Sequence, residues 1–386
     1  MASDYTGVSM SAIEPADTDL TRLAGDVKRW GLELGFQRLG IADCDLSTYA
    51  PEVRRWVAEG LHGSMGYMER NLEKRLDPAQ LLPGTVRVIV ARMDYLPPGT
   101  EPQSVLRNRS LGYVSRFAVG RDYHKVLRGR LKRLARRIDE VARQQQCRAF
   151  TDSAPVLEKA LAEKAGLGWI GKHTLLLDRE AGSFFFLGEI YTDLPLPVDL
   201  PAHSDHRTDH CGACRACINV CPTSAILGPR RLDARRCIAY LTIESHDPIP
   251  HELRRAIGNR IFGCDDCQLV CPWNRFATPS AERDFAPRSG LDRSPLLELF
   301  AWSEPEFYAR TEGSALRRID YRQWLRNLAV ALGNAPFDES IVPVLEARRA
   351  GLDAAADAMV IEHIDWAIAE QRAKSGDSLL ISAQPE

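Results

Sequence analysis

The amino-acid sequence predicts an α+β protein in three parts: a mixed α/β domain, a small cysteine-rich domain and a helical C-terminal region. Helical and extended patterns alternate over roughly the first 200 residues, eight of the ten cysteines lie between Cys211 and Cys271, and the sequence beyond Pro272 has helical patterns only. We expect a disordered lead over 1–19, the α/β domain over 20–200, the cysteine-rich domain over 201–285 and the helical region over 286–386.

Length and composition indicate a globular protein with a sizeable core. The chain has 386 residues, of which 45% are hydrophobic and 26% charged, and its formal net charge is −2. Its first residues are acidic where a signal peptide needs a basic patch, and no segment approaches the ~18 uninterrupted apolar residues of a membrane span. We therefore expect a cytoplasmic protein that does not contact a membrane. Reduced thiols suit that compartment better than disulfides do.

The α/β domain begins with four alternating elements. Apolar residues at helical spacing predict a helix over 20–34, which Gly35 ends, and a short strand over 36–42 follows. A second helix is expected near 53–59. Residues 86–91 form a continuous apolar run with β-branched members, which is typical of a buried strand.

A strongly basic helix is expected next, between Arg107 and Arg148. Its apolar residues recur at helical spacing, so the basic residues, among them Arg128, Arg130 and Arg133, occupy the exposed face. Two interpretations remain open, a solvated helix face and a surface that binds a polyanion, because clustered charge alone is a weak sign of nucleic-acid binding.

After the basic helix, a strand over 149–151 ends at Asp152. We expect a helix over 155–165 and a hairpin made of strands 174–177 and 184–191. Beyond the cysteines, helices are expected over 295–301 (capped by Ser294), 321–332, 341–350 and 354–371. The pair over 321–350 resembles one HEAT-type hairpin, although a solenoid needs about three such repeats. This helical appendage is also suited to covering the cysteine-rich domain.

The cysteine spacing predicts two iron–sulfur clusters. The first run has the pattern C-x2-C-x2-C-x3-C-P, in which the fourth cysteine serves the other cluster. The second run is one cysteine short, and Cys237 supplies it. Zinc sites and a disulfide framework are the alternatives, and they fit this spacing poorly. The crossover assigns Cys211, Cys214, Cys217 and Cys271 to cluster one, and Cys221, Cys237, Cys264 and Cys267 to cluster two.

A glycine-rich segment over 166–173 matches two nucleotide-binding patterns in spacing. Both patterns need a strand before the glycines and a helix after them, whereas here a helix precedes and an extended segment follows. In addition, His173 stands where a P-loop needs a hydroxyl. We therefore reject both patterns. Glycines at this density still indicate close approach of the backbone to another group.

Asp152 is the candidate catalytic carboxylate, because it ends a strand just ahead of the glycine-rich segment. The competing interpretation is a helix cap, since Asp152 or Ser153 before Pro155 is a favourable N-terminal arrangement. Local sequence alone favours the cap.

Several segments together resemble the epoxyqueuosine reductases of tRNA queuosine biosynthesis, a family related to reductive dehalogenases. They are residues 152–158 (DSAPVLE), 165–172 (AGLGWIGK), 120–125 (GRDYHK), 75–78 (RLDP) and the double cysteine run with Cys237 between its halves. The resemblance extends from about residue 20 to 370. It is specific in combination, since the cysteine runs alone occur in many families.

The resemblance implies a cobalamin enzyme with two [4Fe–4S] clusters. It would reduce the epoxide at the wobble position of a tRNA anticodon stem-loop to the alkene, taking up two electrons and two protons and releasing water. It implies that Asp152 is the general acid and contacts the cofactor, a role that burial would favour by raising its pKa. The residues it implies for the cobalamin site are Arg75, Lys172, His173, Thr174 and Ala239.

The resemblance also sets the expected partners and the alternatives. We expect a monomer, an external low-potential electron donor, and cobalamin without a histidine ligand, because the chain contains no D-x-H-x-x-G. One alternative is a dehalogenase-like enzyme acting on a small molecule. The other is a two-cluster electron carrier, for which about 200 residues ahead of the clusters would have no use.

Overall fold

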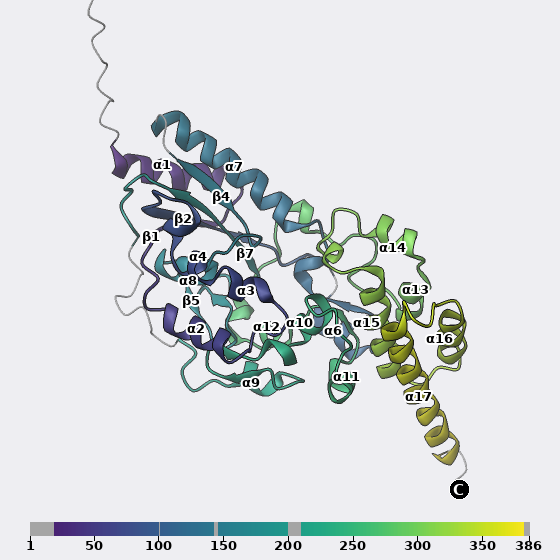
Figure 1. Cartoon of the computed structure of the whole chain (residues 1–386). Coiled ribbons are helices and arrows are strands. Elements are labelled where there is room, and N and C mark those ends of the chain that lie inside the picture. The colour runs from purple at the N-terminus through teal and green to yellow at the C-terminus, as the bar shows by residue number, and fades with distance from the viewer. Residues whose placement is uncertain (1–18, 100, 143–145, 200–209, 382–386) are drawn as a thin grey trace, which may run out of the picture.

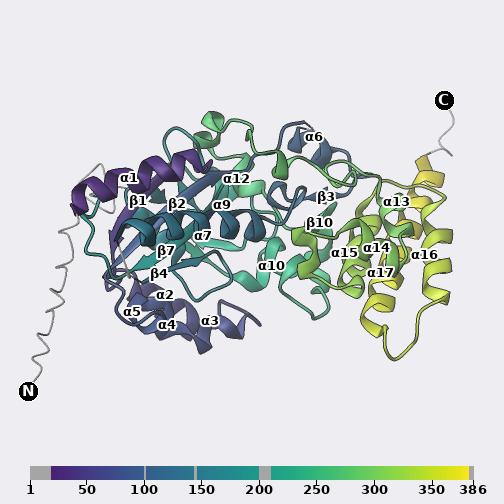
Figure 2. The ribbon, with the colours of Figure 1, turned by 90° about the horizontal axis from the view of Figure 1, so that it is seen from above.

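The computed structural model describes residues 19–99, 101–142, 146–199 and 210–381. The expected lead and the boundary near residue 200 lie outside these residues. The molecule is elongated, with the α/β part at one end and the C-terminal helices at the other (Figures 1 and 2). Within the described ranges, no helix combines the length and apolar character that crossing a membrane requires.

A four-stranded antiparallel sheet forms the centre of the α/β part. Its strand order is β1 (Arg38–Asp43), β2 (Arg87–Asp94), β7 (Phe185–Thr192) and β4 (Cys147–Phe150). All eight residues of β7 are buried, because neighbouring strands flank it and both of its faces are covered. The strands predicted from apolar runs are therefore confirmed, with their ends shifted by one to three residues.

Helices cover both faces of this sheet. On one face, α1 (Leu20–Glu33) and α7 (Tyr123–Ala142) pack against Ile41, Ile89 and Ile190. On the other face, α8 (Glu158–Lys164) packs against the opposite side chains of the same strands. The remaining elements of this part are α2 (Ala50–Ala58), α3 (Gly66–Arg70), α4 (Leu72–Leu76), α5 (Pro78–Leu81), α6 (Pro102–Arg107), β3 (Tyr113–Val114), η1 (Arg116–Ala118), β5 (Trp169–Ile170) and β6 (Leu176–Leu177).

The cysteine-bearing segment and the C-terminal helices share one hydrophobic core. Residues 114–119 also reach this core, since β3 pairs in parallel with β10 (Arg260–Phe262). The elements before residue 290 are α9 (Ala216–Val220), β8 (Ile226–Gly228), β9 (Arg231–Leu232), η2 (Ala234–Arg236), α10 (Ile238–Ile243), α11 (His251–Ile257), α12 (Asp266–Leu269), η3 (Pro272–Phe276) and η4 (Arg283–Phe285). The C-terminal elements are α13 (Leu296–Ala301), α14 (Glu304–Arg310), η5 (Ala315–Arg318), α15 (Tyr321–Asn334), α16 (Ile341–Ala350) and α17 (Ala358–Ile381).

The structure corrects three local predictions. The helix expected from residue 155 begins only at Glu158, and no side chain caps it. The expected hairpin is wrong, because β6 pairs with β5 while β7 pairs with β2 and β4. Ser294 does not cap α13, since its hydroxyl donates to the carbonyl of Gly290 over 2.8 Å.

Arg326 ties the C-terminal helices to the cysteine-bearing segment. Its side chain is fully buried on α15 and donates to the carbonyls of Leu241, Ser245 and Asp247 over 2.7–2.8 Å. These carbonyls lie at and just beyond the end of α10, where a positive charge is favoured. Thus α15 covers the cysteine-bearing segment, as one of the two predictions for this region proposed.

We expect Arg326→Met to lower the free energy of unfolding by about 3 kcal/mol, because it leaves several buried carbonyls without a donor. Thermal denaturation at matched iron content measures this. Arg349→Met is the matched control, since the Arg349–Asp365 ion pair is about half exposed and contributes at most ~1 kcal/mol. Equal losses in the two variants would contradict the assignment.

Candidate functional site

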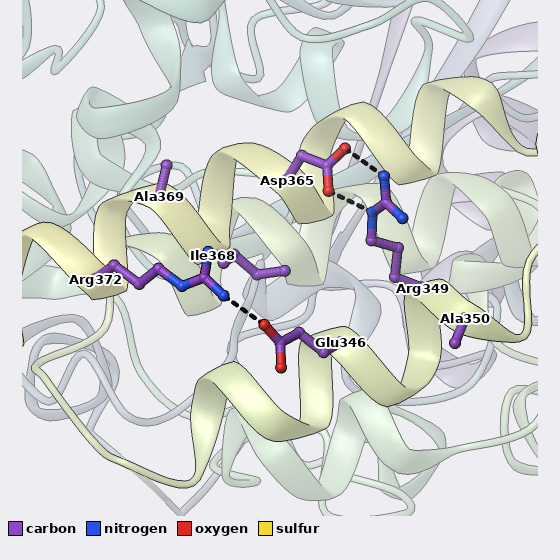
Figure 3. A pocket seen from close by; sticks show the side chains of 7 residues that line it. All are labelled: Glu346, Arg349, Ala350, Asp365, Ile368, Ala369 and Arg372. Atoms are coloured by element: carbon purple, nitrogen blue, oxygen red, sulfur yellow. Dashed lines mark hydrogen bonds and ion pairs between the residues drawn. The ribbon is translucent and has the colours of Figure 1, made fainter.

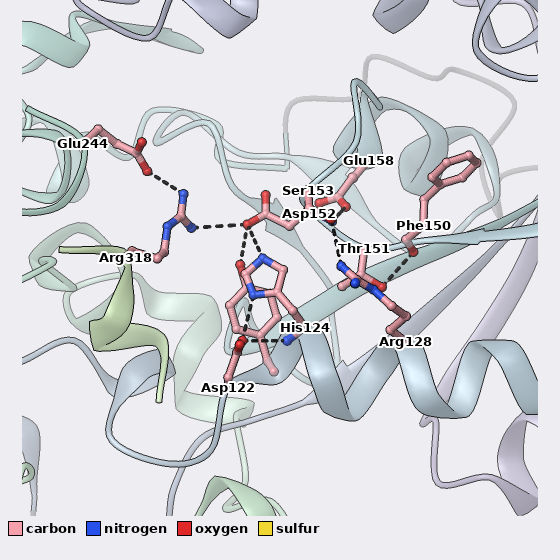
Figure 4. A network of polar contacts seen from close by, with 11 residues as sticks. Asp122, His124, Arg128, Phe150, Thr151, Asp152, Ser153, Glu158, Glu244 and Arg318 are labelled. Atoms are coloured by element: carbon pink, nitrogen blue, oxygen red, sulfur yellow. Dashed lines mark hydrogen bonds and ion pairs between the residues drawn. The ribbon is translucent and has the colours of Figure 1, made fainter. Parts of the chain in front are cut away.

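Asp152 lies at the centre of a polar network drawn in Figure 4. Its Oδ2 atom accepts hydrogen bonds from the Tyr123 hydroxyl, from His124 Nε2 over 3.2 Å and from Arg318 Nη1 over 3.4 Å. These donors come from the start of α7 and from η5, which are remote in sequence from Asp152. The cap interpretation is wrong, because the carboxylate accepts from side chains and not from the first turn of α8.

The backbone at Asp152 adopts a left-handed conformation, with φ of +49°. Such a conformation costs free energy for residues other than glycine, although aspartate tolerates it better than most. The side chain keeps 40% of its surface exposed, so it remains accessible to a ligand. Strand β4 therefore ends in a strained turn that presents an accessible carboxylate.

The pKa of Asp152 is lowered, contrary to the expectation that burial raises it. Burial acts in the expected direction, but the hydrogen bonds from His124 and Tyr123 and the charge of Arg318 outweigh it. For His124, burial alone would lower the pKa, whereas hydrogen bonds to Asp122 and Asp152 raise it to about 9. At neutral pH the proton therefore resides on His124, within hydrogen-bonding distance of Asp152.

We expect the His124 imidazole to titrate near pH 9 and its midpoint to fall in Asp122→Asn, because Nδ1 then loses a charged partner 2.8 Å away. The folded-state pKa lies above the ordinary value of 6.5, so the stabilisation is complete below pH 6.5 and disappears as the pH rises through about 9. Histidine NMR measures the midpoint, and His124→Gln identifies the resonance. A midpoint near 6.5 would contradict the network.

The residues proposed to contact a cofactor occupy three separate segments, namely α4, the glycine-rich segment and α10. Arg75 is buried on α4 and donates to the carbonyl of Val156 over 3.2 Å, next to the Asp152 turn. His173 is buried in the glycine-rich segment, and burial lowers its pKa to about 4. Thr174 follows with a positive φ of 69°, and Ala239 is half-buried on α10.

Lys172 differs from the other proposed cofactor residues. Its ammonium group donates to the carbonyl of Cys214 over 3.0 Å and to that of Gly212. The lysine therefore joins the glycine-rich segment to the first cysteine run. Gly168 has a φ of +152°, and a Cβ there would overlap the carbonyl oxygen of Leu177, so the close approach predicted from the glycines is to the chain's own backbone.

All ten cysteines have free thiols. Burial raises the pKa of Cys217, and the nearby thiolates of Cys211, Cys271 and Cys214 raise it further. Burial likewise raises the pKa of Cys267, with further contributions from Cys237, Asp265, Cys217 and Cys221. Cys271 thus lies near the first run, while the division of the ligands between two clusters stays a prediction. Among the described residues, no three histidine, cysteine or acidic side chains are arranged to hold a single metal ion.

Sequence reasoning missed four residues of this site: Tyr123, His124, Glu158 and Arg318. Tyr123 and His124 lie within segment 120–125 and Glu158 lies within segment 152–158, and both segments carry the resemblance, so the resemblance could have identified all three. Glu158 accepts the backbone N–H of Asp152 over 2.6 Å. Nothing local distinguishes Arg318, whose other partner is Glu244 at 2.6 Å.

A separate cavity of about 450 Å³ lies between α16 and α17 (Figure 3). Its charged side chains neutralise one another, since Arg349 pairs with Asp365 at 2.5 Å and Arg372 with Glu346 at 2.6 Å. It contains neither a cysteine nor any residue of the Asp152 network, and we assign it no role in the chemistry.

Two family models match the chain. "4Fe-4S double cluster binding domain" matches residues 210–274, and "Epoxyqueuosine reductase QueG, DUF1730" matches residues 75–153. The epoxyqueuosine reductase of Pseudomonas aeruginosa is 58% identical over 91% of this chain and 95% of that protein. The one from Escherichia coli K12 is 56% identical over 92% of this chain and 90% of that protein.

Solved structures of epoxyqueuosine reductases have the same fold. One, crystallised with a tRNA-Tyr epoxyqueuosine-modified stem loop, has a TM-score of 0.83 at 26% identity and covers 95% of this chain and 96% of its own. Another, from Bacillus subtilis, has its catalytic aspartate loop swung out of the active site. Its TM-score is 0.81 at 27% identity, and the match covers 92% of this chain and 91% of that chain.

Proposed function

The chain belongs to the epoxyqueuosine reductase family, and from this membership we propose that it reduces the epoxide of epoxyqueuosine in tRNA to the alkene of queuosine. The observation that carries the proposal is the accessible, hydrogen-bonded Asp152 carboxylate in a chain 58% identical to a named reductase. Two electrons and two protons enter and one water leaves.

The residues present fit cobalamin. Arg75 Nε and His173 Nε2 are buried polar atoms without a hydrogen-bond partner among the described residues, and a cofactor rich in amide groups can supply such partners. Cobalamin, when bound, supplies a strong low-potential nucleophile and reductant. Arg75 and His173 would hold it, and Thr174 and Ala239 would border it.

The eight cysteines would hold two [4Fe–4S] clusters that deliver electrons one at a time. Lys172 belongs with this part of the site, because it binds the carbonyls of the first cysteine run. Lys172 would fix the glycine-rich segment against cluster one and, as the family resemblance implies, would also contact cobalamin.

Asp152 would transfer the proton to the oxygen released when the epoxide opens. The carboxylate cannot carry that proton alone at neutral pH, since its pKa is lowered. His124 holds a proton up to about pH 9 and lies 3.2 Å from Asp152 Oδ2, so it can recharge Asp152. We expect the reaction rate to fall as the pH rises through about 9.

Anaerobic reconstitution with iron, sulfide and cobalamin tests the function. Incubation with epoxyqueuosine-containing tRNA should convert the nucleoside to one that is lighter by one oxygen, as measured by mass spectrometry. Corrinoid binding with an unchanged nucleoside would favour the dehalogenase-like alternative. A protein that takes up both clusters without a corrinoid absorption band would favour the electron carrier. We propose that an external electron donor reduces the clusters. We also propose that the enzyme is a monomer and acts in the cytoplasm.

The exposed face of α7 is proposed to bind the phosphates of the tRNA stem. Arg128 donates to Ser153 Oγ over 3.0 Å, and Arg130 pairs with Glu282. Replacing either residue would therefore disturb contacts within the protein as well as any contact with tRNA. Lys132, Arg133 and Arg136 are exposed and better suited.

We expect Lys132→Glu, Arg133→Glu and Arg136→Glu together to weaken tRNA binding. Each lost phosphate contact should reduce the slope of log K against log salt by about 0.7–0.9. Binding titrations at several salt concentrations measure this, and cofactor spectra should not change. Arg372→Glu on α17 is the control, and weakening only in that variant would place the tRNA on the C-terminal helices.

A further inference from the structure

Glu189 carries a carboxylate that is buried in the centre of the sheet. It lies on β7, on the side facing α8, and its exposed fraction is 0%. Neither of its carboxylate oxygens accepts a hydrogen bond from the described residues. Burying an ionised carboxylate without a partner is so unfavourable that the group takes up a proton instead.

The polar group that Glu189 meets is the carboxyl of Glu158, the first residue of α8. Two ionised carboxylates cannot hydrogen-bond to each other, because both only accept. Burial is the largest cause that raises the pKa of both groups, to about 8 for Glu158, and the charge of Asp152 raises both further. The Glu158 carboxyl also raises the pKa of Glu189. The pair therefore holds at least one proton at neutral pH.

Charged neighbours do not supply a simple counterion for Glu189. Lys159 on α8 is exposed to solvent, and its charge lowers the pKa of Glu158. The other titratable groups facing the pair are Asp152 on its turn, Tyr123 and His124 on α7, Arg75 on α4 and Tyr191 on β7.

Glu158 connects this pair to the proposed catalytic turn. Its Oε1 atom accepts the backbone N–H of Asp152 over 2.6 Å, at the residue with a φ of +49°. A strained residue keeps its conformation only where its surroundings hold it. Figure 4 shows Glu158 beside Asp152, across from His124 and Arg318.

We propose that Glu189 and Glu158 share a proton and act together as a positioning pair, which holds the backbone of Asp152 in the conformation that aims its carboxylate at His124. Glu189 donates to Glu158, and Glu158 accepts from Asp152. The expected effect of this pair on the reaction rate rests on the proposed function. Its effect on the backbone conformation of Asp152 does not.

Hydrogen exchange of the reconstituted holoenzyme directly tests whether the pair stabilises the backbone conformation of Asp152. Deuterium uptake is measured in peptides covering residues 150–157. We expect exchange at the Asp152 amide to accelerate about tenfold in Glu158→Ala and Glu189→Leu, because a buried hydrogen bond is lost or loosened. Glu189→Gln keeps a donor of the same shape and should stay within about twofold of the wild type.

Leu187→Ala is the matched control, since Leu187 lies two residues away on the same face of β7 and carries no polar group. It should destabilise the core without accelerating exchange at Asp152. Equal acceleration in Leu187→Ala and Glu189→Leu would overturn the proposal, as would unchanged exchange in Glu189→Leu or rapid exchange in Glu189→Gln.

Single-turnover kinetics separate this inference from the proposed function. Glu189→Leu should lower the reduction rate about tenfold while tRNA affinity stays the same, and Glu189→Gln should restore the rate. A wild type that does not reduce the nucleoside would refute the function but leave the exchange result intact. Normal exchange in Glu189→Leu with an active wild type would refute the positioning pair alone.

Discussion

Asp152→Asn should reduce the rate of epoxyqueuosine reduction by about 10²–10⁴-fold, the usual contribution of a positioned general acid. The amide keeps the shape of the side chain but does not pass a proton from His124 to the substrate oxygen. Single-turnover conversion, followed by the mass of the nucleoside, measures the effect. Corrinoid and cluster spectra and tRNA affinity should remain those of the wild type.

Asp122→Asn provides the graded control for that result. Asp122 holds the other side of the His124 ring but does not contact Asp152. The variant should lose much less activity at neutral pH, and the fall in its rate should move to lower pH as the pKa of His124 decreases. A rate for Asp152→Asn within about threefold of the wild type would remove Asp152 from the reaction, because the expected range begins near 10².

Much of the fold could be predicted because its signals are local. The amphipathic spacing in α1 and α7 and the apolar runs in β1 and β2 each lie within one segment. The pairing of β7 could not be predicted this way, since its neighbours β2 and β4 come from distant segments and displace the adjacent strand β6. Proximity in sequence therefore gave the wrong partner for the most buried strand.

In the candidate site, too, features with a local sequence signal could be predicted and features that depend on distant residues could not. The cluster ligands could be predicted from the cysteine spacing, because short fixed gaps direct several thiolates to one cluster. The environment of Asp152, by contrast, depends on Arg318, which lies 166 residues away. Burial alone would have raised the pKa of Asp152, and only the folded arrangement of His124, Tyr123 and Arg318 reverses that direction. Glu189 did have a local signal, as the one charged residue within the buried strand 185–192.

The second large expected effect is the loss of one cluster when a cysteine involved in the crossover between the two runs is replaced. Cys271 lies in the second run, yet it contributes, with Cys211 and Cys214, to the local field at the first-run residue Cys217. We expect Cys271→Ser to lose cluster one and Cys221→Ser to lose cluster two, each with about half of the iron and sulfide. Both variants should lose epoxyqueuosine reduction, because electrons then no longer pass through both clusters.

The EPR spectrum of the remaining cluster distinguishes the crossover from a linear arrangement. If the runs exchange their last cysteines, the spectrum of Cys271→Ser should match that of Cys211→Ser, and the spectrum of Cys221→Ser should match that of Cys264→Ser. If each run instead serves its own cluster, Cys271→Ser should match Cys264→Ser. The comparison does not depend on catalysis, so it decides the ligand assignment whether or not the tRNA is reduced. Because each cluster then takes a ligand from both runs, loss of either cluster should also loosen the packing of α9 against α12, which carry Cys217 and Cys267.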